Sequence, residues 1–452
     1  MTHASPVHPT PPDPEARSRG LPLHLKVLIG FVLGAALGLA VHFYAPGWPQ
    51  PLQDFVDGFI HYATKPFGQI FLGMLFMLVI PLMMSALVLG VGELGDVASL
   101  GRLGWKTLAY TAAVTGFAVA IGLLMVNLLQ PGLHMDPATV QKAMSLNAAK
   151  AGQIVSSGQK LNAVDLIVNI VPKNVFAAMV DEKQSLGVVF FALMIGIGLV
   201  LSPSPATQAF KNALQGLFEV CMRLIGLFIR LAPYAVACFM FNLCAQLGLD
   251  VLKSLGWFVL TVVGALALHM FVVIPLWVRF MGRMSPLRFF RDSQEAILTA
   301  FATASSAATL PVTLRVAEEN LMLPRKVARF VLTVGASANH HGTALFEGVT
   351  VLFLAQVSGL HLDLAHQVMV LGLCILGGIG TAGIPSGSLP VIAMICGVVG
   401  LKPEGIGIII GVNSFLDMCR TALNVTGDLA TAVVVAERTT EPDPIAEPDL
   451  PA

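Results

Sequence analysis

A series of apolar stretches long enough to cross a lipid bilayer constrains this chain most strongly. A membrane-spanning helix needs about 20 predominantly apolar residues. Stretches of about that length lie at 23–44, 67–91, 105–129, 186–201, 210–247, 254–278, 327–355 and 406–436, and two shorter, interrupted ones lie at 296–314 and 368–399. Because 56% of the 452 residues are hydrophobic and only 12% are charged, we predict an all-α, multi-pass integral membrane protein surrounded by lipid.

The basic residues are sorted along the chain in a way that predicts its orientation. They gather before the first and seventh apolar stretches and after the second, sixth and eighth. The positive-inside rule places these basic residues in the cytoplasm, together with both termini. These residues are Arg17, Arg19, Lys26, Arg102, Lys106, Arg279, Arg283, Arg288, Arg291, Arg325, Lys326, Arg329 and Arg438. The formal net charge is zero, so we expect no nucleic-acid partner. We expect the protein to lie in the inner (plasma) membrane of a bacterium.

Composition divides the chain into tails, membrane regions and one polar stretch. Residues 1–20, rich in Pro and His, and the acidic, Pro-rich residues 439–452 are predicted to be disordered cytoplasmic tails. Residues 131–183 form the most polar stretch and are predicted to be an external loop. The six cysteines lie mostly in apolar runs without CxxC spacing, so neither disulfides nor a zinc site is indicated.

A stripe of polar residues runs along the last apolar stretch. At about 100° per residue its members share one face of a helix. They are Asn413, Asp417, Arg420, Thr421, Asn424 and Asp428. A charge at membrane depth costs from about 3 to more than 10 kcal/mol, so such groups face a cavity, a partner or a ligand. Two acids, one guanidinium and neutral oxygen donors suit a zwitterion together with a cation.

The two interrupted segments carry similar tracts of small residues. Residues 303–311 (TASSAATLP) and 377–388 (GGIGTAGIPSGS) each combine Gly, Ala or hydroxylated residues with a proline. Such tracts either allow helices to pack closely or form re-entrant hairpins around a site near the membrane midplane. Two tracts near a charged helix favour hairpins, whose unwound backbone offers carbonyls to cations and helix N-termini to carboxylates.

Four motifs, taken in order, identify a family resemblance. They are ASSAATLP at 304–311, GASANHHGTALFEG at 335–348, GTAGIPSG at 380–387 and DMCRTALNVTGD at 417–428. From about residue 21 to 437 the chain resembles the dicarboxylate/amino acid:cation symporters, which include archaeal aspartate transporters and mammalian excitatory amino acid transporters. The resemblance implies eight transmembrane helices plus two re-entrant hairpins, a homotrimer, and a transport domain that moves like an elevator against a scaffold.

The same resemblance implies a division of the chain and its site residues. Residues 21–284 would hold spans 1–6 with most of the scaffold and trimerisation elements, and 285–438 the core of the transport domain. Arg420 would bind the side-chain carboxylate of the substrate and Asp417 its amino group. Further substrate contacts would be Ser305, Ser306, Thr343, Gly383, Thr421 and Asn424. One sodium site would use Gly335, Asn339, Asn424 and Asp428, and a second Ser337, Gly378, Ile379, Gly380 and Thr381. No other cofactor is implied.

Several positions depart from the family pattern. His340 and His341 stand where the family has a methionine and the acid of a third sodium site, and Val114-Thr115 replaces a hydroxyl pair, so that third site is predicted to be absent. His341 either carries a proton in place of the ion or is a neutral core residue. The positions where family members place an arginine and its acid partner are neutral, namely Ala304, Met418 and Asn413.

Three functions can be compared with this pattern of residues. An acidic amino acid symporter for aspartate or glutamate, coupled to sodium, protons or both, uses both Arg420 and Asp417. A C4-dicarboxylate:cation symporter has no use for Asp417. An intramembrane metalloenzyme would use His340, His341 and Glu347, but adjacent histidines point about 100° apart on a helix and no HExxH motif accompanies them. We therefore predict a transporter and not an enzyme.

Overall fold

The computed structural model describes residues 23–94, 97–159, 161, 164, 168–181, 184–380, 383 and 386–437. Within these residues the chain forms helices and connecting turns and no β-strand, which confirms the all-α prediction. The tails predicted at 1–20 and 439–452 lie outside the described residues.

The first part of the chain forms long apolar helices separated by a group of short ones. The helices α2 and α3 form one nearly continuous rod, joined by the π-helical turn Ile60–Thr64. The bounds are α1 (Leu23–Tyr44), α2 (Gln50–Phe59), α3 (Lys65–Leu94), α4 (Val97–Leu129), α5 (Pro137–Leu146), α6 (Ala148–Gly158), α8 (Val175–Val180), α9 (Ser185–Leu201), α10 (Pro205–Phe228), α11 (Ala232–Ser254), α12 (Gly256–Leu268) and α13 (Ile274–Phe280).

The expectation of a loop over 131–183 is wrong for much of that stretch. Its first half is rich in Ala, Gln and Lys, which favour helix, and it forms α5 and α6. Both helices pack on the 3-10 turn Pro403–Ile408, and α6 also packs on α19 (Ser388–Val398). Burial of Ala151 and Val155 in that packing gives the short helices the tertiary support that they need.

The C-terminal part consists of shorter, paired helices. A break at Asn339 and His340 divides the apolar stretch 327–355 into two helices, a break that the apolar composition of this stretch does not indicate. The break persists because both side chains bind groups outside their own helices. The elements are α14 (Pro286–Thr303), α15 (Ser306–Arg315), α16 (Arg325–Ala338), α17 (His341–Val357), α18 (Leu364–Gly380), α19 and α20 (Ile410–Glu437).

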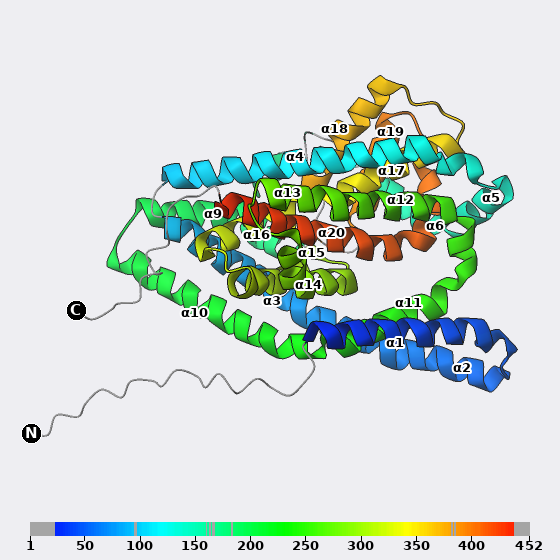
Figure 1. The fold of residues 1–452 in the computed structure, drawn as a ribbon, viewed down its shortest axis with the longest axis horizontal. Helices are drawn as coiled ribbons and strands as arrows, with labels where there is room; N and C mark the ends of the chain where they lie inside the picture. The colour runs from blue at the N-terminus through cyan, green and yellow to red at the C-terminus, as the bar shows by residue number, and fades with distance from the viewer. Residues whose placement is uncertain are drawn as a thin grey trace, which may run out of the picture.

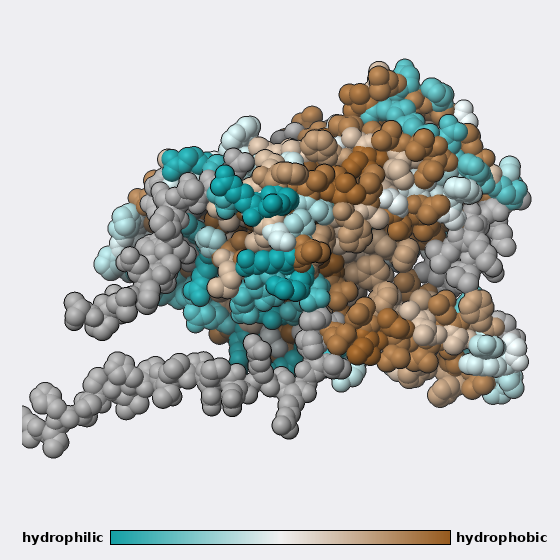
Figure 2. Space-filling model, viewed as in Figure 1, coloured by the Kyte–Doolittle hydropathy of each residue, from teal (hydrophilic) through white to brown (hydrophobic). Residues whose placement is uncertain are grey.

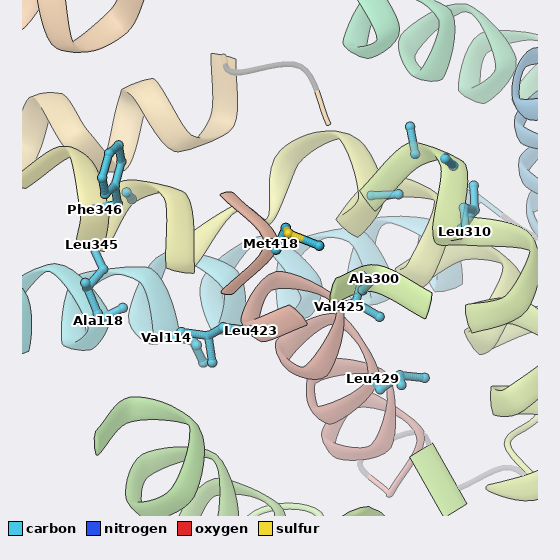
Figure 3. Packing of buried hydrophobic residues seen from close by; sticks show 14 of the residues in the cluster. Val114, Ala118, Ala300, Leu310, Leu345, Phe346, Met418, Leu423, Val425 and Leu429 are labelled. Atoms are coloured by element: carbon cyan, nitrogen blue, oxygen red, sulfur yellow. The ribbon is translucent and has the colours of Figure 1, made fainter. Parts of the chain in front are cut away.

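The arrangement encloses α20 within the molecule. Figure 1 shows α20 between α4 along one side and α1, α10 and α11 along the other. Contacts place α14, α16 and α17 against α20, while α17 also packs along α4. In the packing shown in Figure 3, Ala118 of α4 lies beside Leu345 of α17, and Val114 of α4 lies beside Leu423 of α20. The polar face of α20 therefore meets protein and not lipid.

The outer surface is apolar over a large area. Figure 2 shows hydrophobic residues covering much of one half of the visible face, and Leu37, Phe55 and Trp105 are 60%, 67% and 73% exposed. An apolar surface of this extent is suited to lipid. Among the described residues, five helical stretches are long and apolar enough to span a membrane, at Leu25–Tyr44, Gln50–Gly92, Ala98–His134, Pro205–Ala245 and Gly256–Phe280.

Candidate functional site

The polar stripe of α20 is buried along its whole length. None of its six members is more than 5% exposed, so each depends on partners supplied by neighbouring elements. Beside it lies a cavity of about 10 Å³, which has room for about one water molecule. The cavity is lined by Ala304, Ser306, His340, Thr343, Gly383, Gly387, Ser388, Asp417, Arg420, Thr421 and Asn424.

Two hairpin tips meet at this cavity. The α14–α15 hairpin turns at Ala304, and the α18–α19 hairpin turns at Ser386; their φ angles are 49° and 62°. Both residues are thus in the left-handed region that non-glycine residues rarely adopt. The Ser305 hydroxyl donates to the carbonyl of Gly383 at 2.6 Å, and the Ala307 N–H donates to the same carbonyl at 3.2 Å. These bonds join the two tips directly.

Arg420 is the largest of the most deeply buried side chains, with 1% exposure. Its Nε donates to Asp417 Oδ1 at 2.7 Å, and its Nη2 donates to Asn413 Oδ1 at 3.2 Å. The guanidinium also lies 4.2 Å from the ring centroid of Phe346. Among the described residues, Arg420 Nη1 has no hydrogen-bond partner. A buried donor without a partner is costly, so this nitrogen is suited to an anionic ligand.

The remaining predicted substrate contacts gather at the same cavity. Asn424 accepts from the Gly342 N–H at 2.8 Å and donates to the Thr343 hydroxyl at 3.0 Å. Ser306, Gly383 and Thr421 line the cavity. The sequence did not single out two contacts: Asp417 Oδ2 accepts from the Ser386 N–H at 2.5 Å, and Asn413 donates to the Ser386 hydroxyl at 2.9 Å. The position of Asn413 on the polar stripe was the available signal.

Three of the four residues predicted for the first sodium site lie together. Asn339 Nδ2 donates to Asp428 Oδ1 at 2.7 Å, and a Cβ on Gly335 would lie 2.5 Å from the same carboxylate oxygen. In the part of the chain that the structure describes, Asn339 Oδ1 has no partner and no basic side chain pairs with Asp428. Asn424, the fourth residue, directs its side chain to α17 instead.

The residues predicted for the second sodium site are only partly described. Ser337 is buried, and its hydroxyl has no partner among the described residues. The carbonyl of Gly378 lies 3.0 Å from His340 Nδ1, and His340 Nε2 lies 3.2 Å from the carbonyl of Ala336. Ile379 and Gly380 are the last residues of α18. Thr381 lies outside the described residues.

The His341 ring lies beside a residue that the sequence did not single out. Its ring centroid is 5.2 Å from that of His269, and both side chains are fully buried. All four ring nitrogens are without a hydrogen-bond partner among the described residues. A Cβ at position 427 would overlap the His341 ring, so only glycine fits there. An isolated histidine within the apolar stretch 254–278 was the signal for His269.

An intramembrane metal site, the alternative drawn from the sequence, would require His340, His341 and Glu347 to face one ion. His340 and His341 have different neighbours, backbone carbonyls for the first and His269 for the second. Within the described ranges, no group of three or more His, Cys, Asp or Glu side chains is placed to hold a metal ion.

Comparison with known proteins gives consistent matches over nearly the whole chain. The model of the sodium:dicarboxylate symporter family matches residues 23–438. A proton/sodium-glutamate symport protein of Geobacillus stearothermophilus is 29% identical over 93% of this chain and 95% of its own length. A proton/glutamate-aspartate symporter of Escherichia coli is 30% identical over 91% and 92%. An excitatory amino acid transporter of Caenorhabditis elegans is 31% identical over 83% and 81%.

The contact between Gly427 and His341 leads to a stability prediction. Gly427→Ala should destabilise the protein by about 1–3 kcal/mol, because the added methyl overlaps a fully buried ring. Gly397→Ala is the matched control, since a Cβ there meets no atom within 4 Å. Thermal unfolding of both variants in detergent, followed by circular dichroism, measures the difference. Equal stability of the two variants would show that His341 moves aside without cost.

Proposed function

Because the chain belongs to the sodium:dicarboxylate symporter family, a family of secondary transporters and not of enzymes, we propose that it is a symporter of an acidic amino acid. The substrate is aspartate or glutamate, and the coupling ions are sodium, protons or both. The names of three relatives support this substrate class. These relatives are named as a glutamate symport protein, a glutamate-aspartate symporter and an excitatory amino acid transporter.

The observation that carries the proposal is the state of Arg420. Its guanidinium lines the cavity, is buried, and retains a nitrogen without a partner in the described structure. A planar guanidinium binds a carboxylate through two parallel hydrogen bonds. Asp417, one turn away, supplies the opposite charge for an α-ammonium group. Together they suit a molecule that carries both an ammonium group and a second carboxylate.

The remaining predicted contacts would complete the substrate site around these two charges. Ser305, Ser306 and Gly383 would contribute from the hairpin tips, and Thr343 from α17. Thr421 and Asn424 would contribute from α20, on the same face as Arg420.

The cation sites rest on the buried carboxylate of Asp428. A buried charge needs compensation, and Asp428 has no basic partner among the described residues. Carboxylate and amide oxygens are suitable ligands for hard cations. The first site would use Gly335, Asn339, Asn424 and Asp428. The second site would use Ser337, Gly378, Ile379, Gly380 and Thr381. His340 and His341 remain candidate coupling groups.

The architecture that we propose extends the all-helical fold. The chain would form eight transmembrane helices and two re-entrant hairpins, in a homotrimer with both termini in the cytoplasm of a bacterium. Residues 21–284 would provide most of the scaffold and trimerisation elements, and 285–438 the core of an elevator-type transport domain. The turns at Ala304 and Ser386 support the hairpins, since the helix after each turn, α15 with 10 residues and α19 with 11, is shorter than a full span.

A C4-dicarboxylate symporter is the second candidate, favoured by the description of the family. Uptake into proteoliposomes under sodium and proton gradients, imposed separately, tests both candidates. We expect accumulation of labelled aspartate or glutamate, and none of succinate, because only the amino acids use the charge of Asp417. Accumulation of succinate without either amino acid would favour the second candidate, and accumulation of none under both gradients would contradict symport of acidic substrates.

Arg420 provides the most direct test of the substrate site. Arg420→Ala should weaken aspartate binding by about 2–5 kcal/mol, or about 30-fold or more, because a buried carboxylate loses its cationic partner. Arg420→Lys keeps the charge without the planar fork and should recover only part of that affinity. Equilibrium binding of labelled aspartate to the purified variants measures the loss. Unchanged affinity in Arg420→Ala would refute the carboxylate assignment.

Asp428 tests the cation assignment. Asp428→Asn should weaken sodium binding, and by linkage it should shift the sodium dependence of aspartate binding to higher concentrations. Aspartate binding titrated with sodium chloride, against choline chloride at equal ionic strength, measures the shift. If wild-type binding does not respond to sodium, protons are left as the coupling ions and the sodium sites are wrongly assigned.

A further inference from the structure

An apolar crevice lies on the side of α20 that faces away from the substrate cavity. It has a volume of about 290 Å³ and is lined by residues of α1, α11, α12, the π-helical turn His269–Val273, α14 and α20. On α20 the lining residues are Cys419, Ala422 and Leu423. At about 100° per residue, these three point away from the polar stripe. The crevice and the substrate cavity therefore touch opposite faces of one helix.

The crevice separates two groups of helices that are each closely packed. α1 lies so near α11 that a Cβ on Gly34 would be 2.2 Å from the carbonyl oxygen of Ala237. On the other side of the crevice, α14 packs along α20. The rings of Phe31 and Phe301, both of which line the crevice, bring the two groups into contact with their centroids 5.4 Å apart. Because protein interiors are packed as densely as organic crystals, a space of this size between them is suited to an occupant.

The lining of the crevice shows what kind of occupant fits. Apart from Cys419, every lining residue is Ala, Val, Leu, Ile, Met or Phe. A buried water molecule needs several polar partners, and an engineered apolar cavity of about 150 Å³ stays dry and binds benzene. This crevice has about twice that volume and the same apolar character. It is therefore suited to hydrocarbon and not to water.

The crevice leads inward from the outer surface. Leu28 of α1 and Phe271 are exposed, whereas Leu266 and Leu423 are buried, although all four line the same space. The outer surface is apolar over a large area, as Figure 2 shows for one face, and such a surface is suited to lipid. The hydrocarbon available at this entrance is the acyl chain of a membrane lipid.

Basic residues lie near one end of the crevice. Lys26 is exposed and stands one residue before the first lining residue of α1. Arg291 lies seven residues before Leu298, which places it about 10 Å away on the same face of α14. Arg288 and Arg291 share the carboxylate of Asp292, so these three side chains carry one net positive charge. Guanidinium and ammonium groups in such positions bind phosphate.

We propose that the crevice binds an acyl chain of an anionic phospholipid, whose phosphate group lies near Lys26 and Arg291. The chain fills the space between the α1–α11 and α14–α20 pairs and contacts the apolar face of α20. The bound lipid thereby supports, from the opposite face, the helix that carries Asp417 and Arg420. This site is additional to symport and does not depend on which substrate is carried.

Crosslinking with a photoreactive lipid tests the site in the full-length wild-type protein. The probe is phosphatidylglycerol with a diazirine near the end of one acyl chain, reconstituted with the purified protein and irradiated. We expect peptide mass spectrometry to find the lipid attached within residues 419–423, since the buried Ala422 and Leu423 are reached from the bilayer through the crevice. Crosslinks confined to exposed positions such as Leu37 and Trp105 would overturn the proposal, because an empty crevice or one covered by protein gives that result.

A substitution that fills the crevice provides a matched pair of variants. Ala267→Phe places a ring in the crevice, so lipid attachment within 419–423 should fall about tenfold, as expected for a loss of about 1.4 kcal/mol. Ala120→Phe adds the same ring on an exposed part of α4 and should leave attachment unchanged. Circular dichroism and gel filtration check that both variants are folded. Equal attachment in two folded variants would overturn the proposal, and the wild-type map decides alone if Ala267→Phe does not fold.

The charge of the lipid is tested with a zwitterionic probe. Wild-type attachment within 419–423 should be stronger for phosphatidylglycerol than for phosphatidylcholine carrying the same diazirine chain. Arg291→Gln should reduce attachment of phosphatidylglycerol about fivefold, as expected for the loss of one basic residue near a lipid phosphate, and should leave phosphatidylcholine unchanged. Equal attachment of the two lipids to the wild type would overturn the anionic headgroup.

Discussion

The buried guanidinium of Arg420 is the interaction on which the C-terminal half of the structure depends. An uncompensated charge in apolar surroundings is unfavourable by several kcal/mol, so the side chain has to be surrounded by partners. Asp417, Asn413 and the face of Phe346 provide them. Asp417 and Asn413 lie on α20 itself, and Phe346 lies on α17. Asp417 and Asn413 also bond to Ser386 at the α18–α19 tip, so this group of contacts links the polar face of α20 to α17 and to that tip.

Interrupted helices supply the groups that this stripe needs. A regular helix uses its own backbone N–H and C=O groups, so a site at membrane depth requires unwound segments. The break after α16 frees Asn339 and His340 to reach Asp428 and Gly378. At the tips, Gly383 and Ser386 offer a carbonyl and an N–H to side chains. A polar ligand uses hydrogen-bonding groups of the same kind. These backbone groups can therefore bond either to the protein's own side chains, which closes the site, or to a ligand within it.

Periodicity and composition predicted the features that depend on the chain alone. The spacing of Asp417, Arg420 and Asp428 predicted a common buried face, and the small-residue tracts predicted turns within apolar segments. The break at Asn339 was missed, because it exists only where partners on α18 and α20 replace the lost helix bonds. The contact of His269 with His341 joins residues far apart in sequence. The helices at 137–158 depend on packing with the turn Pro403–Ile408 and, for α6, with α19, which no local pattern reveals.

Charge balance links the stripe to cation coupling. With all three groups ionised, Arg420, Asp417 and Asp428 carry one net negative charge on α20, and an acidic amino acid adds a second. Two monovalent cations, the number of sites that the sequence predicts, bring this set to zero. Substrate without cations leaves two negative charges, and cations without substrate leave one positive charge. Because burying net charge in hydrocarbon is costly, the elevator-type movement that we propose would be favoured only when both substrate and cations are bound. Ala304, Met418 and Asn413 are neutral, so these three positions leave the balance unchanged.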